Sequence, residues 1–213
     1  MNYYELYVLN TVIDGEDINS IEPFSNKKMT GIAADVIKDA LIENGLLKDY
    51  KTLTIQGVLV INRIKQFKEA KKYVRILNMT IGFVNDTLGI LLRTDPNENY
   101  FFSVINIKKN LETVTKAFPE FLLLDGKGST SHKDSYISPE SLLQKYEINA
   151  KTSFTLSTEI RSSKEKDMTG YNTKELFFES AGKKYCYDCY NNILLERDRT
   201  TLVDMLHKRL EVV

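Results

Sequence analysis

Apolar residues recur at helical spacing in two consecutive segments of the first third of the chain. The first segment follows Thr30, which suits a helix N-cap, and precedes Gly45, which stands where a left-handed residue commonly ends a helix. The second segment follows Thr54, another N-cap residue. The pattern predicts helices over about 30–47 and 54–73. Their apolar stripes are Ile32, Val36, Ile37, Ala40 and Leu41 in the first helix, and Val58, Ile61, Ile64, Phe67 and Ala70 in the second.

The hydrophobic period changes to two after Tyr73, which indicates β-strands. Alternating apolar residues predict a strand over 73–83 and another over 88–92, joined at Asn85-Asp86. A third strand is expected over 100–107 after a turn at 95–99, followed by a short helix over 108–118 that ends before Pro119. Two short apolar runs fit more than one element: residues 3–12 suit a helix or a strand, and residues 121–124 suit a strand or the tail of the preceding helix.

Residues 125–135 are rich in Gly, Ser, Lys and Asp and mark the clearest change of composition, which indicates an exposed connector. The pattern of a helix followed by strands then starts again. The expected elements are a helix from Ser138-Pro139 through Tyr146, a strand over 154–160, strands over 174–180 and 183–190 joined by Ala181-Gly182, and a helix over 199–210.

The pattern thus predicts a helix, three strands and a helix in each half of the chain, although no residue-level repeat is visible. We therefore predict an α+β fold in which a central, mostly antiparallel sheet is flanked by helices and the two halves are pseudo-symmetric. The 213 residues suit a single α+β domain. Its N-terminal half is expected over about 1–124, the polar connector over about 125–137, and the C-terminal half over about 138–213.

Composition narrows the classes of function. Lys and Arg number 29, as do Asp and Glu, so the chain lacks the basic excess that a dedicated nucleic-acid or membrane-surface binder usually carries. The N-terminus shows no secretory signal, and the longest apolar runs are too short to span a bilayer. These features predict a cytoplasmic protein without membrane insertion.

Cys186 and Cys189 form a C-x-x-C motif, which occurs in thiol redox sites and in zinc sites. A redox cysteine usually stands at a helix N-terminus, whereas these two lie in or at the end of an aromatic strand, where the spacing sends them to opposite faces. A zinc site needs further ligands, and the only histidines are His132 and His207. Two core or surface cysteines are the favoured interpretation, and a thiol enzyme is the alternative.

No other motif predicts catalysis. Gly126-Lys127-Gly128-Ser129-Thr130 lacks the spacing of a phosphate-binding P-loop, because its lysine does not directly precede Ser or Thr. Neither histidine has a nucleophile or carboxylate that the sequence places beside it. We therefore predict no catalytic residue, no cofactor, no metal and no enzymatic activity.

Two surfaces are candidates for binding. The helix over 54–73 carries a basic face, whose simplest interpretation is a solvated surface. Aromatic residues gather in the strands over 174–190, and exposed rings on a sheet often anchor interfaces, unless the sheet is covered on both sides. The basic residues are Arg63, Lys65, Lys68, Lys71 and Lys72, and the candidate partner-binding residues are Phe177, Tyr185, Tyr187 and Tyr190.

Over about residues 1–110 a series of short motifs follows in a particular order. The motifs are Leu9-Asn10, Asp14-Gly15-Glu16-Asp17-Ile18, Ala34, Leu41-Ile42, Gly45-Leu46-Leu47, Leu53-Thr54, Gly57 and Val74-Arg75-Ile76. Their order resembles the opening of the EspG-like chaperones of type VII (ESX) secretion systems, in particular the shorter EsaE/EssE-type members. The resemblance implies a cytosolic chaperone or adaptor that binds a helical secretion substrate, such as a toxin or a small helical export protein. Such a protein keeps its substrate soluble and delivers it for export, which implies contact with the secretion machinery. The family contributes no catalytic residues.

One alternative function comes from the helices over 30–47 and 54–73 and the strands after them, which together suit a winged helix-turn-helix. In that reading the protein is a nucleic-acid-binding regulator whose basic helix face enters the groove. The turn of about nine residues, Gly45 to Leu53, is long for that motif, and the net charge is zero.

Overall fold

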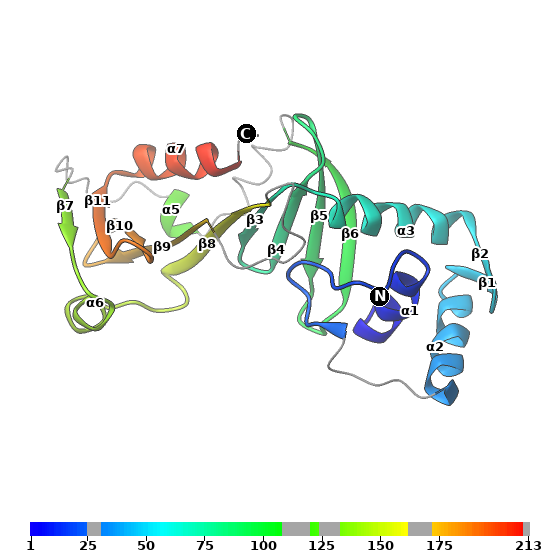
Figure 1. The fold of residues 1–213 in the computed structure, drawn as a ribbon. Helices are drawn as coiled ribbons and strands as arrows, with labels where there is room; N and C mark the ends of the chain where they lie inside the picture. The colour runs from blue at the N-terminus through cyan, green and yellow to red at the C-terminus, as the bar shows by residue number, and fades with distance from the viewer. Residues whose placement is uncertain (25–30, 108–119, 124–132, 162–171, 211–213) are drawn as a thin grey trace. The chain divides into compact units, whose positions relative to one another are not determined.

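The computed structural model describes residues 1–24, 31–107, 120–123, 133–161 and 172–210 (Figure 1). The helices in these ranges are α1 (Tyr3–Thr11), α2 (Gly31–Glu43), α3 (Ile55–Lys68), α5 (Glu120–Leu123), α6 (Pro139–Lys145) and α7 (Arg199–Leu210). The strands are β1 (Leu47–Asp49), β2 (Thr52–Leu53), β3 (Lys72–Ile76), β4 (Met79–Phe83), β5 (Leu88–Thr94), β6 (Tyr100–Asn106), β7 (Lys133–Tyr136), β8 (Ser153–Ile160), β9 (Thr173–Ser180), β10 (Lys183–Asp188) and β11 (Ile193–Arg197).

Nine of these strands form one antiparallel sheet in the order β6-β5-β4-β3-β8-β9-β10-β11-β7, and helices flank it. The predicted α+β class with a central antiparallel sheet is therefore confirmed. The pseudo-symmetry of the two halves is not confirmed. The expected pattern of three strands in each half is wrong, because β3 and β4 form where one strand was expected and β11 was not predicted.

The described chain packs as two compact units. The first unit contains residues 1–70 and 78–105, and the second contains residues 71–77 and 106–213. The division therefore does not follow the polar segment over 125–137. Part of that segment, residues 133–136, forms strand β7 instead of a loop.

Helix α2 ends in a Schellman motif in the first unit. Gly45 adopts a φ of +68°, and its amide donates to the carbonyl of Ile42 at 2.9 Å. The amide of Leu46 donates to the carbonyl of Leu41, also at 2.9 Å. These two bonds satisfy carbonyls that a helix end leaves without partners. The left-handed glycine predicted at this position is confirmed.

Thr54 joins the end of α2 to the start of α3. Its Oγ accepts a hydrogen bond from the amide of Gly57 at 3.0 Å, which is the predicted N-cap. The same hydroxyl donates to the carbonyl of Gly45 at 2.6 Å, and the amide of Thr54 donates to the carbonyl of Leu46 at 3.1 Å. We call Gly45, Leu46, Thr54 and Gly57 the α2–α3 junction.

Gly57 is the point of closest approach in this junction. A Cβ atom added to Gly57 would lie 2.1 Å from the carbonyl oxygen of Leu46, well inside the contact distance of two such atoms. Because a backbone atom cannot move aside as a flexible side chain can, only glycine fits here without displacing α3 from Leu46.

We expect Gly57→Ala to lower the free energy of unfolding by about 1–3 kcal/mol, the usual cost of forcing an extra carbon into a packed site. Urea denaturation followed by circular dichroism measures the effect. Gln56→Ala is the matched control, because Gln56 is exposed in the same turn of α3. Equal denaturation midpoints for the two variants would contradict the close approach.

A hairpin replaces the single strand predicted over 73–83. Strand β3 ends at Ile76, β4 begins at Met79, and Leu77 between them adopts a φ of +53°. Leucine seldom adopts positive φ, so Leu77 itself does not indicate a turn. The traces of the turn are Asn78, a common turn residue, and the break in the two-residue period between Ile76 and Met79.

Helices cover both faces of the strands in the second unit (Figure 1). On one face, Leu142 of α6 packs in a buried cluster with aromatic residues of β9 and β10. On the other face, α7 buries three leucines and pairs Arg209 with Glu175 at 2.6 Å. The buried leucines are Leu202, Leu206 and Leu210.

Several element predictions are settled by the described residues. Residues 3–11 form a helix, residues 120–123 form a short helix, and α7 occupies the predicted range over 199–210. The Ser138 cap and the hairpin turn at Ala181-Gly182 are confirmed. Helix α3 ends at Lys68, so the predicted end at residue 73 is wrong. Thr30 and the helix expected over 108–118 lie outside the described residues.

Candidate functional site

Three of the four predicted partner-binding aromatics belong to the core of the second unit. Phe177, Tyr185 and Tyr187 are 0%, 6% and 3% exposed, whereas Tyr190 is 53% exposed. The expectation that these rings lie on an open sheet face is therefore wrong for the first three. Among the four, Tyr190 alone presents a side chain that a partner can reach.

The buried rings are held by specific contacts. Phe177 stacks on Phe154 with ring centroids 5.2 Å apart, and Tyr185 stacks on Phe178 at 5.0 Å. The hydroxyl of Tyr187 lies 2.6 Å from the side-chain oxygen of Asn192, to which it donates. These contacts identify the aromatic strands as a packed core covered by helices on both faces.

The polar residues beside Phe177 explain why its strand pattern suggested an exposed ring. Glu175 and Glu179 share its face of β9, as expected, but neither is simply solvated. Glu175 pairs with Arg209 of α7, and Glu179 pairs with the buried Lys184 at 2.7 Å. Ion pairing allows carboxylates to accompany a buried ring, so charge on this face does not indicate exposure.

Cys186 and Cys189 occupy different environments on opposite faces, as their spacing predicts. Cys186 is 1% exposed and lies opposite Phe177 in the β9–β10 register. Cys189 is partly exposed and packs against the cluster under α6. Burial raises the pKa of both thiols, which lowers the fraction of each that is thiolate at neutral pH.

We expect the folded protein to react with a thiol reagent such as DTNB at Cys189 alone, and more slowly than a free thiol. Denaturation in guanidinium chloride should then expose the second thiol. Cys189→Ser should remove the reaction of the folded state, and Cys186→Ser should leave it in place. Two rapidly reacting thiols in the folded protein would contradict the burial of Cys186.

The predicted basic face of the helix over 54–73 is not a continuous exposed surface. Lys68 lies 9% exposed and pairs with Asp14, and the Lys72 side chain is buried in β3. Arg63 donates to the carbonyl of Phe102 at 3.3 Å. Of the five cations, only Lys65 and Lys71 are exposed. The row of free cations on which a groove-binding helix depends is therefore absent from α3.

An apolar stripe lies on the exposed side of α3 instead. Ile55, Val58 and Leu59 are 84%, 44% and 45% exposed, and their i, i+3, i+4 spacing places them on one face of the helix. The opposite face buries Ile64 and Phe67 completely. Val58 was expected in the buried stripe, and that assignment is wrong. We call Ile55, Val58 and Leu59 the outer face of α3.

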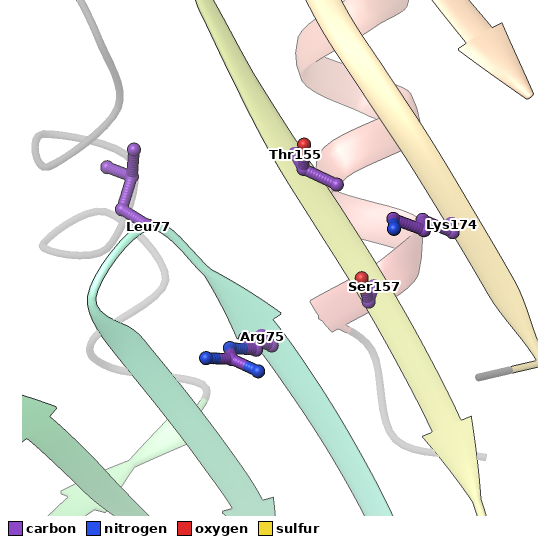
Figure 2. Close-up of a pocket in the computed structure, with 5 residues that line it drawn as sticks. All are labelled: Arg75, Leu77, Thr155, Ser157 and Lys174. Carbon is purple, nitrogen blue, oxygen red and sulfur yellow. The ribbon is translucent and has the colours of Figure 1, made fainter. Parts of the chain in front are cut away.

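A hollow lies on three strands of the second unit. It has a volume of about 330 Å³ and is lined by Arg75, Leu77, Thr155, Ser157 and Lys174. Figure 2 shows Ser157 on β8 between Arg75 on β3 and Lys174 on β9. Residues from three separate segments meet here, and only the strand register brings them together. We call this feature the β3–β8–β9 hollow.

Within the residues that the structure describes, no group of three or more His, Cys, Asp or Glu side chains is arranged to hold a metal ion. Across the same ranges, no helix is both long enough and apolar enough to cross a membrane. His132 and the glycine-rich residues 126–130 lie outside the described ranges.

These observations define an α+β protein with an exposed apolar helix face in one unit and a basic hollow in the other. A family model described as "Domain of unknown function (DUF5081)" matches residues 1–213, and the chain belongs to that family. No curated protein matches the chain. The family description names no ligand or activity.

Proposed function

We propose that the protein is a chaperone or adaptor of a type VII secretion system that binds a helical secretion substrate through the outer face of α3. The observation that carries the proposal is the alignment of Ile55, Val58 and Leu59 on the exposed side of one helix. Apolar residues scattered singly over a surface are ordinary, but several on one helix face indicate a binding surface.

Burial of this face supplies a driving force for association. Fully burying one aliphatic side chain contributes about 1.5–3 kcal/mol, so the three residues together offer several kcal/mol. The gain must exceed the entropy lost on association, which requires further contacts at the rim of the interface. Polar residues adjoin the stripe on α3, among them Gln56 and Asn62.

The spacing of the stripe favours a helical partner. Residues at i, i+3 and i+4 form the ridge that packs into the groove of a second helix, with the two axes 8–10 Å apart. A secretion substrate with an amphipathic helix presents the matching surface. Covering that surface until export would keep the substrate soluble in the cytoplasm and then allow its transfer to the secretion machinery.

The resemblance over residues 1–110 supports the same proposal, because its motifs coincide with the parts that position α3. Gly45-Leu46, Leu53-Thr54 and Gly57 form the α2–α3 junction and its approach. In a chain with these residues, one side of α3 packs against the first unit and the other side stays exposed to solvent. Their conformation is thus tied to the surface that we assign to the partner.

We expect Leu59→Glu to weaken binding of a co-encoded small helical export protein by at least about 30-fold, the effect of losing a central apolar contact and adding a charge. Isothermal titration calorimetry with the purified pair measures the affinity. Gln56→Glu is the matched control, because it adds the same charge in the same helix about 100° around from Ile55.

Equal weakening by Leu59→Glu and Gln56→Glu would show that charge, and not the apolar stripe, governs the association. Failure of every co-encoded helical protein to bind the unsubstituted chain would overturn the proposal itself. Circular dichroism of both variants distinguishes lost binding from lost folding.

A further inference from the structure

We propose that the β3–β8–β9 hollow binds the phosphate group of a small phosphate ester. The inference goes beyond the partner proposal, because the hollow lies within the second unit and the outer face of α3 belongs to the first. It starts from strand register: Arg75 pairs with Ser157 on β8, and Ser157 pairs with Lys174 on β9. The three residues therefore form one row across three strands, with their side chains on one face.

The row places two cations on either side of a hydroxyl. Neighbouring strands lie about 4.8 Å apart, so the Cα atoms of Arg75 and Lys174 are separated by roughly 10 Å. Both side chains are long enough to converge over Ser157, and both residues are exposed. Thr155, two residues before Ser157 on the same face of β8, lines the hollow with a second hydroxyl.

This donor set suits a tetrahedral oxyanion. A guanidinium offers two parallel N–H donors, an ammonium offers a point charge with three donors, and the serine and threonine hydroxyls donate from the strand between them. The donors belong to three neighbouring strands. A phosphate group has oxygens to meet all of them, whereas a planar carboxylate has two.

Glu159 is an acidic residue on the same face of β8 as Ser157. It lies two residues beyond Ser157. Its carboxylate is 3.8 Å from Arg161. The guanidinium of Arg161 in turn stacks over the ring of Tyr73. That acid is thus balanced by its own cation. Arg75 has another interaction within the chain, and the proposal needs only some of its five N–H donors.

The hollow is larger than one inorganic anion requires. A volume of about 330 Å³ lies at the lower end of the range for small-molecule sites. Leu77, which is 47% exposed, lines the hollow as its apolar residue. A phosphate ester with a compact apolar group would place the phosphate over Ser157 and the remainder against Leu77.

The test is a titration of the full chain with inorganic phosphate and with phenyl phosphate, followed by ¹H–¹⁵N NMR at constant ionic strength. We expect both ligands to shift the amide signals of residues 155–157 and 174, with phenyl phosphate binding more tightly. Lys174→Gln and Arg75→Gln should each weaken binding by about tenfold or more, the usual effect of losing a charged hydrogen bond. Leu77→Ala should weaken the binding of phenyl phosphate and leave that of phosphate unchanged.

Lys145→Gln is the matched control, because it removes an exposed lysine of the second unit outside the hollow. If Lys145→Gln and Lys174→Gln weakened phosphate binding equally, the ligand would be attracted by positive charge in general. That result would overturn the proposal. Absence of shifts at residues 155–157 would overturn it as well. Lys174→Arg should retain most of the affinity, which separates the charge from any effect of Lys174→Gln on folding.

Discussion

The contact between Gly57 and the carbonyl of Leu46 is the constraint on which the first unit and its surface depend. It brings the first turn of α3 against the residues that directly follow α2, and Thr54 fixes the geometry by bonding to both. One side of α3 is consequently buried in the interior of the first unit. Since Ile55, Val58 and Leu59 lie on the other side, the same contact determines which apolar residues remain in water.

The second unit is organised differently, around charges that accompany a buried aromatic sheet. Arg209 and Lys184 neutralise glutamates on the face that α7 covers, and α6 covers the opposite face. The row of Arg75, Ser157 and Lys174 lines the hollow on β3, β8 and β9. Both candidate sites are thus places where the packing of a helix or a sheet remains incomplete within the described chain.

Local features of the fold could be predicted from the sequence. Thr54 and Ser138 cap helices, and Gly45 ends one, because the chemistry of a cap involves residues only a few positions apart. The turn at Leu77 could not be predicted in this way. Leucine carries no local preference for positive φ, and the β3 and β4 strands that flank Leu77 were expected as one continuous strand.

The residues of the candidate sites could not be predicted from the sequence for a related reason. Whether Phe177 or Tyr187 is exposed depends on where α6 and α7 pack, which strand alternation does not reveal. The row of Arg75, Ser157 and Lys174 appears only when the register is known, since the three residues lie in separate parts of the chain. The outer face of α3 had a visible signal, because Ile55 and Leu59 add apolar positions outside the buried stripe.

Site-specific photo-crosslinking in the cells that produce the protein tests the central claim most directly. A benzoylphenylalanine at position 55 or 59 should capture a helical export substrate, with the crosslinked peptide lying in an amphipathic helix of that substrate. The same group at Lys145 should capture none of it. Capture from Lys145 with equal yield, or capture at positions 55 and 59 of proteins without such a helix, would contradict the assignment of the outer face of α3 as the partner surface.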